Sequence, residues 1–118
     1  MVDIVPFKGL LFNQTKTGSI DQVTAPPYDV ISPQQQTALY EKNPFNVIRL
    51  ILEKQYPEDD EGNNRYTRSS KTFRKWIDEE VLVKDEKPAF YVYSQEYISE
   101  GQSICRVGFF ARVRTEDF

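Results

Sequence analysis

The stretch "PAFYVYSQEYISEGQSICRVGFFARV", residues 88–113, decides the fold class of this chain. Two runs rich in aromatic and β-branched residues flank the polar, glycine-containing segment "SEGQ", and this pattern is typical of a β-hairpin. We expect a type I turn with Gly101 in the left-handed conformation, because Glu100 tolerates a positive φ poorly. That loop predicts a register with Tyr91 and Tyr93 on the face of Cys105, Val107 and Phe109, and with Arg106, Phe110 and Arg112 on the other face.

The segment before the hairpin carries the pattern of a long helix. From Asn63 or Asn64 to about Glu80, one apolar stripe recurs at steps of three and four residues; it consists of Tyr66, Ser69/Ser70, Phe73, Trp76/Ile77 and Val81. The acidic loop "PEDDEG", residues 57–62, lacks the spacing of a calcium-binding loop and is expected at the surface. Basic residues on another side of the helix predict a solvated face; they are Arg65, Arg68, Lys71 and Lys75.

The first half of the chain mixes strand and helix signals. The segment "SPQQ", residues 32–35, forms a capping box with a proline at the first helical position, and predicts a short helix to about Lys42. The run "FNVIRLIL", residues 45–52, is apolar and β-branched on both faces and predicts a central strand. Residues 4–13 predict two short β-like runs, and the polar segment "NQTKTGSIDQ", residues 13–22, predicts a loop.

This order of elements predicts an α+β domain over residues 1–118. We expect a mixed or antiparallel sheet, one short and one long helix, and a C-terminal β-hairpin. A chain of 118 residues is one domain or a part of one.

The composition excludes several function classes. No histidine is present, which rules out Ser-His-Asp and Cys-His catalysis and histidine-containing zinc sites. Cys105 is the single cysteine, so no internal disulfide forms, and a reducing, cytoplasmic compartment is expected. The net charge of -3 argues against nucleic acid as a partner of this segment. No signal peptide or membrane span is predicted, and no metal site is assigned from the residues.

The segment "TAPPYDVISPQQQ", residues 24–36, contains the first candidate site. Pro26 and Pro27 restrict the backbone, so they could hold Tyr28 and Asp29 at the rim of a cleft as a base, metal ligand or substrate contact. The alternative is that Asp29 caps a turn while Tyr28 packs on the core. The residues alone favour the alternative, since aspartate is common in turns.

Two arginines are further candidates. Arg49 lies within an otherwise apolar run, where a buried guanidinium needs a partner. That partner is either a ligand phosphate or carboxylate, or a structural group of the protein, and the sequence favours neither. Arg106 lies on a basic and aromatic strand face with Phe110, Arg112 and Arg114. Such a face binds a nucleotide or, as we prefer, docks against another part of the protein.

Five blocks carry a resemblance to a known family. They are "IVPFKGLLFN" (4–13), "VTAPPYDVIS" (23–32), "NPFNVIRLIL" (43–52), "NRYTRSSKTFRKWIDEEVLV" (64–83) and the hairpin with the residues after it. In these blocks the chain resembles the N-terminal part of the domain-of-unknown-function family 1015 (DUF1015). Members of that family are longer, which implies that this chain is an excised N-terminal segment.

The resemblance implies a function in outline. The family is thought similar to the ParB/sulfiredoxin superfamily, which includes a free-serine kinase and whose members bind nucleotides. The expected activity is nucleotide-dependent phosphoryl transfer to a small polar substrate, with a nucleotide and Mg²⁺ as cofactors of the intact protein. The alternatives are a ParB-like DNA-associated or regulatory binding protein and a purely structural segment.

The resemblance also assigns roles to residues. Asp29 becomes the expected catalytic residue, with Tyr28, Arg49 and Arg106 as substrate- or nucleotide-binding residues and Pro26 and Pro27 as the structural rim. The family's histidine-containing phosphate motif lies downstream, and this chain has no histidine. We therefore expect this segment alone to be inactive and its main partner to be the missing C-terminal part of its own chain.

Overall fold

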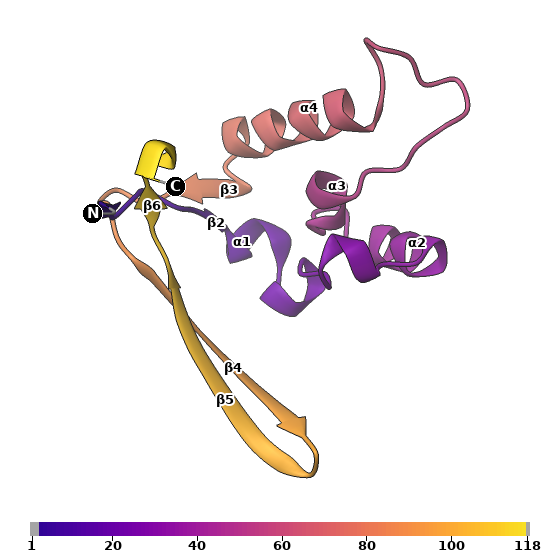
Figure 1. Cartoon of the computed structure of the whole chain (residues 1–118). Coiled ribbons are helices and arrows are strands. Elements are labelled where there is room, and N and C mark those ends of the chain that lie inside the picture. The colour runs from indigo at the N-terminus through magenta and orange to yellow at the C-terminus, as the bar shows by residue number, and fades with distance from the viewer. Residues whose placement is uncertain (1–2, 118) are drawn as a thin grey trace. The chain divides into compact units, whose positions relative to one another are not determined.

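A computed structural model describes residues 3–117 and confirms the predicted α+β fold (Figure 1). The chain forms two compact units, which we call the hairpin unit (residues 3–10 and 84–117) and the helical unit (residues 11–83). The strands are β1 (Ile4–Val5), β2 (Leu10–Phe12), β3 (Leu82–Lys84), β4 (Tyr91–Ser99), β5 (Gln102–Phe110) and β6 (Arg112–Val113). The α-helices are α1 (Gln14–Thr17), α2 (Pro33–Lys42), α3 (Ile48–Ile51) and α4 (Arg65–Asp78), and single 3-10 turns are formed by Ile20–Gln22, Tyr28–Val30 and Thr115–Asp117.

The core of the helical unit surrounds Trp76 on α4. The rings of Phe12 and Phe45 contact its indole, with centroids 6.1 Å and 5.9 Å away. Val23, Ile48, Val81 and Leu82 are the other buried apolar residues described. Strands β2 and β3 pair at the two ends of this unit. The Asn13 amide also donates to the Val81 carbonyl at 2.8 Å, so the first and last turns of the unit are tied together.

The strand expected over residues 45–52 is wrong, because this run forms the single helical turn α3. The reason is Asn46, whose side chain is fully buried. Its Oδ1 accepts the Ile48 amide at 2.9 Å, which starts the turn, and its Nδ2 donates to the Gln22 and Thr24 carbonyls at 3.0 Å each. A short buried helix and a central strand both give a continuous apolar run, so periodicity does not separate them.

The two longer helices are confirmed. Helix α2 begins after Ser32 with the predicted capping box: the Ser32 amide donates to Gln35 Oε1 and the Gln35 amide to Ser32 Oγ, at 2.7 Å and 3.2 Å. Helix α4 begins after Asn64 with a second capping box and ends at Asp78. The loop expected over residues 13–22 is wrong, because Asn13 caps the four-residue helix α1 and a 3-10 turn follows. Among residues 3–117 no helix has the length and apolar character to span a bilayer.

The β4–β5 hairpin is confirmed, but its register differs from the expected one. Glu100 and Gly101 both take positive φ, 52° and 77°, and Ser99 pairs with Gln102. This is a two-residue loop of the type I′ kind, one residue shorter than expected, and a one-residue slip exchanges the two faces.

The faces are therefore reassigned. Tyr91 lies opposite Phe110 and Tyr93 opposite Gly108, so both tyrosines share a face with Arg106 and Phe110. The other face carries Val92, opposite Phe109, together with Cys105 and Val107.

The base of the hairpin unit is fixed by Tyr91. Its hydroxyl accepts the Gly9 amide at 2.6 Å and donates to Asp85, and the bond to Asp85 raises the pKa of Tyr91. Phe7 and Ala89 exchange backbone hydrogen bonds at 3.1 Å and 2.9 Å. Strand β1 pairs with β6 in antiparallel register.

Asn46→Leu should lower the free energy of unfolding of the helical unit by about 2–4 kcal/mol. The substitution keeps the branched shape of the side chain but leaves the Gln22 and Thr24 carbonyls and the Ile48 amide without their partner. Urea unfolding followed by Trp76 fluorescence measures the change. Gln34→Leu, on the exposed face of α2, is the control and should change stability by less than about 0.5 kcal/mol. Equal effects of the two substitutions would show that the Asn46 amide is not a structural anchor.

Gly9→Ala should destabilise the hairpin unit by about 1–3 kcal/mol. A Cβ at Gly9 would lie 2.6 Å from the Tyr91 ring, so the ring must move and lose its bonds to Gly9 and Asp85. Amide hydrogen exchange at Phe7 and Ala89 reports this loss directly. Gly62→Ala is the matched control, because its Cβ meets no atom closer than 3.7 Å. Unchanged protection at Phe7 in Gly9→Ala would contradict the prediction.

Candidate functional site

The segment from Thr24 to Val30 is held at both ends. Upstream, the Asn46 side chain binds the Thr24 carbonyl and the Val47 amide donates to the Val23 carbonyl at 2.8 Å. Pro27, with φ −55° and ψ 141°, then leads into the 3-10 turn Tyr28–Val30. Downstream, helix α2 begins at Pro33. The two prolines and these bonds leave the turn little freedom to move.

Tyr28 and Asp29 point to solvent on this turn. The Tyr28 side chain is 64% exposed and Asp29 is exposed as well. No side-chain hydrogen bond caps the turn, and within residues 3–117 no hydrogen bond or ion pair engages the Asp29 carboxylate. Neither packing of Tyr28 on the core nor turn capping by Asp29 describes this geometry. The fold therefore holds a phenol and a carboxylate outward without using them internally.

A pocket of about 210 Å³, which we call the Tyr28 pocket, opens beside this turn. Helix α3 and the residues after it supply its apolar part, and the first turns of α4 supply its polar part. It is lined by Tyr28, Leu50, Ile51, Leu52, Glu53, Arg65, Tyr66 and Ser69. Of these, only Tyr28 is a site residue expected from the sequence.

The two charged side chains that line the Tyr28 pocket are Glu53 and Arg65, and of these only Glu53 forms an ion pair within the described part of the chain. Glu53 is largely buried and lies 3.9 Å from Arg68 Nε. Arg68 also forms a bidentate ion pair with Asp59, in which Nη1 and Nη2 donate to the two carboxylate oxygens at 2.9 Å and 3.0 Å. This pair lowers the pKa of Asp59 and raises that of Arg68. Arg65 Nε donates to the backbone carbonyl of Glu53 at 3.2 Å. This hydrogen bond does not neutralise the positive charge of Arg65.

Arg49 lies on α3, and its guanidinium is used by the protein itself. Nη1 donates to the Asn43 carbonyl at 2.8 Å and Nη2 to the Tyr40 carbonyl at 3.1 Å, at the C-terminal end of α2. The guanidinium also lies over the Tyr40 ring, 4.4 Å from its centroid. Burial and a hydrogen bond with Glu53 raise the pKa of Tyr40. These contacts match the structural alternative given above for Arg49.

Arg106 belongs to the hairpin unit, where it lies on β5 opposite Gln95 and is exposed. Tyr28, Asp29 and Arg49 all belong to the helical unit. Within the ranges that the structure describes, no cluster of three or more Asp, Glu, Cys or His side chains is placed to hold a metal ion.

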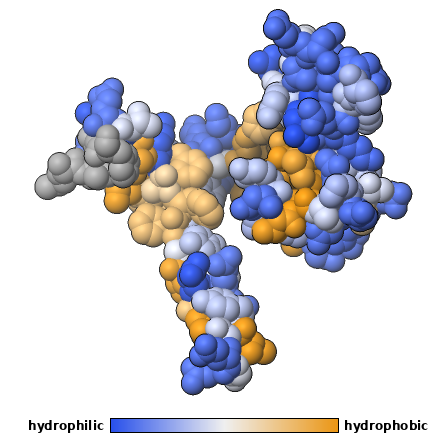
Figure 2. Space-filling view, turned by 45° about the vertical axis from the view of Figure 1, so that its right-hand side comes forward, coloured by the Kyte–Doolittle hydropathy of each residue, from blue (hydrophilic) through white to orange (hydrophobic). Residues whose placement is uncertain are grey.

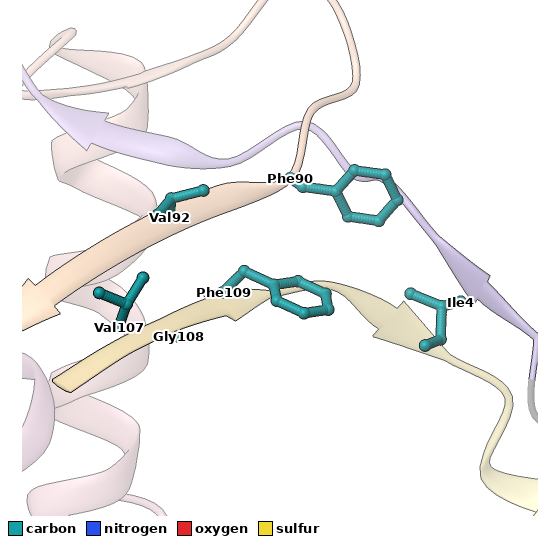
Figure 3. Close-up of a pocket in the computed structure, with 6 residues that line it drawn as sticks. All are labelled: Ile4, Phe90, Val92, Val107, Gly108 and Phe109. Carbon is teal, nitrogen blue, oxygen red and sulfur yellow. The ribbon is translucent and has the colours of Figure 1, made fainter.

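The hairpin unit has its own exposed apolar surface. Figure 2 shows hydrophobic residues along the hairpin, and Figure 3 shows those that line a hollow of about 530 Å³ at its base. Its lining residues are Ile4, Phe90, Val92, Val107, Gly108 and Phe109. Val92 is 73% exposed and Val107 66%. The opposite face also carries exposed aromatic rings, including Phe110 at 58%.

Sequence reasoning missed Arg65, Tyr66 and Ser69 as pocket residues. Arg65 was expected on a solvated helix face, and Tyr66 and Ser69 on the apolar stripe of the helix. Yet Tyr66 is 76% exposed and Trp76 is the one α4 residue that is buried. A polar residue at position 69 within an otherwise apolar stripe was the available signal that this end of the stripe does not face a core.

The fold alone places the chain in the α+β class, whereas comparison with protein families assigns it to one family. The family described as "Protein of unknown function (DUF1015)" matches residues 4–118. The chain belongs to this family, as its sequence blocks indicated. Comparison with curated proteins and with solved structures found no match. The likeness to the ParB/sulfiredoxin superfamily stays a prediction.

Asp59→Asn should destabilise the helical unit at neutral pH and reduce the loss of stability in acid. The pKa of Asp59 is lowered in the folded state by its bond from Arg68, so its contribution is present above the ordinary pKa of 3.8 and is lost as the pH falls below about 4. Urea unfolding at a series of pH values from neutral to acid measures both effects. Glu58→Gln, which removes a neighbouring exposed carboxylate, is the control. Parallel pH profiles for wild type and Asp59→Asn would contradict the prediction.

Proposed function

We propose that this chain is the N-terminal segment of a longer cytoplasmic enzyme that uses a nucleotide to phosphorylate a small polar substrate. The proposal rests on membership of DUF1015 and on the predicted likeness of that family to nucleotide-binding proteins. The structural observation that supports a role for this segment is that Tyr28 and Asp29 are both exposed on a turn whose backbone is restricted by prolines. A carboxylate left without an internal partner is available for chemistry.

In this proposal Asp29 orients the attacking hydroxyl as a base or binds Mg²⁺, the two roles that carboxylates take in phosphoryl transfer. Tyr28 positions the substrate at the adjoining pocket, and Pro26 and Pro27 keep the turn rigid. Arg49 positions α2 against α3 instead of binding phosphate, because its guanidinium already donates to two carbonyls. Arg106 contacts the nucleotide or the downstream part of the chain.

In this proposal, the downstream part of the longer protein also has a structural role. An isolated two-stranded hairpin is marginally stable in water, and this one exposes apolar residues on both faces. Strands with apolar residues on both faces are typical of sheets that are covered on both sides. The downstream part is therefore the proposed partner that extends or covers β4 and β5. The net charge of -3 weighs against the DNA-binding alternative.

Asp29→Asn in the longer protein should lower the rate of phosphoryl transfer by about a hundredfold or more without lowering the melting temperature. A thermal-shift panel with ATP, ADP and CTP, with and without Mg²⁺, first identifies the nucleotide, because a bound ligand raises the melting temperature. The rate is then measured with that nucleotide and a set of small hydroxyl compounds. Asp78→Asn, an exposed aspartate on α4, is the control.

Two results would overturn this proposal. One is the absence of a melting-temperature shift with any of the nucleotides. The other is equal activity of Asp29→Asn and Asp78→Asn, which would leave the turn with a structural role.

A further inference from the structure

We propose that the Tyr28 pocket binds a small organic anion, a carboxylate or a phosphate monoester of about ten non-hydrogen atoms, with Arg65 holding the anionic group. Binding of such an anion follows from the pocket alone. Its identification as the phosphate-accepting substrate rests on the proposed function.

The ion pairs around the pocket favour an anion at Arg65. Of its two charged side chains, Glu53 is paired with Arg68. The terminal nitrogens of Arg68 are in turn engaged by Asp59 and by the Lys54 carbonyl. Arg65 donates through Nε to a backbone carbonyl, which fixes the guanidinium at the pocket without neutralising it. Among residues 3–117 Arg65 is therefore the charged lining residue that forms no ion pair.

The size of the pocket selects a small molecule. A volume of about 210 Å³ corresponds to about seven water molecules at roughly 30 Å³ each. Pockets for drug-sized ligands start at about 300 Å³, so a nucleotide does not fit within this one. In the proposed enzyme the nucleotide then lies elsewhere, and the Tyr28 pocket is left to the second substrate.

The walls of the pocket favour a ligand with a flat or short apolar body. Leu50 and Leu52 supply an apolar floor, while Tyr28 and Tyr66 present largely exposed phenol rings at the edge. The Ser69 hydroxyl already donates to the Arg49 carbonyl at 3.1 Å. The donors left for a ligand are therefore the Arg65 guanidinium and the tyrosine hydroxyls, which suit an oxyanion.

The test is an NMR titration of this 118-residue chain with benzoate and phenyl phosphate, with benzamide as the neutral probe of the same shape. Amide signals of Tyr28, Tyr66 and Ser69 should shift saturably with one or both anions and not with benzamide. The anion that binds more tightly tells whether a carboxylate or a phosphate is preferred. Arg65→Gln should weaken binding by about tenfold or more.

Two further variants keep the test decisive if Arg65→Gln disturbs the fold. Tyr66→Ala removes an exposed wall of the pocket and should also weaken anion binding; among residues 3–117 the Tyr66 hydroxyl forms no hydrogen bond. Arg74→Gln removes an equal charge from another part of α4 and should bind like the wild type. Equal shifts with benzamide, or unchanged affinity in both Arg65→Gln and Tyr66→Ala, would overturn the inference. Anion binding together with a failed nucleotide panel would support the pocket and overturn the proposed function alone.

Discussion

The buried side-chain amide of Asn46 is the contact on which the helical unit depends. Its two hydrogens and its oxygen are all used, by the Gln22 and Thr24 carbonyls and the Ile48 amide. An aspartate of the same shape has no hydrogens to donate, and a leucine has neither donor nor acceptor. One side chain thus joins the segment before the prolines to the turn that begins α3. Tyr28 and the floor of its pocket are placed by the same contact.

This arrangement explains how a site forms from short elements. Helix α3 is one turn long and the Tyr28 turn is shorter still, so neither is stable by itself. Each is fixed by side-chain bonds to backbone groups: Asn46 at one side, and Arg49 at the C-terminal end of α2. Hydrogen bonds from polar side chains to the backbone therefore stabilise these short elements, as backbone hydrogen bonds between strands stabilise a larger sheet. The exposed Tyr28 and Asp29 are supported by the contacts of the buried Asn46 and the half-buried Arg49.

Sequence reasoning predicted the features with local causes. The capping box at Ser32, the cap at Asn64 and the hairpin all follow from neighbouring residues, and all are confirmed. The failures have both local and non-local causes. Ile48–Ile51 form a helical turn because Asn46 reaches carbonyls more than twenty positions upstream, which is a non-local cause. The hairpin register differs because Glu100 accepts a positive φ, which is a local cause. The pocket residue Arg65 was missed because its neighbours come from α3 and the Tyr28 turn, which no local pattern brings together.

The pairing of β1 with β6 sets the order in which the chain can fold during synthesis. Ile4 pairs with Val113, and the whole helical unit lies between them in the sequence. The helical unit needs nothing beyond residue 83 for its internal bonds, so it can fold while the ribosome is still making the hairpin. Strand β1 must wait for about a hundred further residues, which takes on the order of 5–20 s. During that interval an N-terminal strand has left the ribosome without its partner, open to pairing with nascent chains on neighbouring ribosomes.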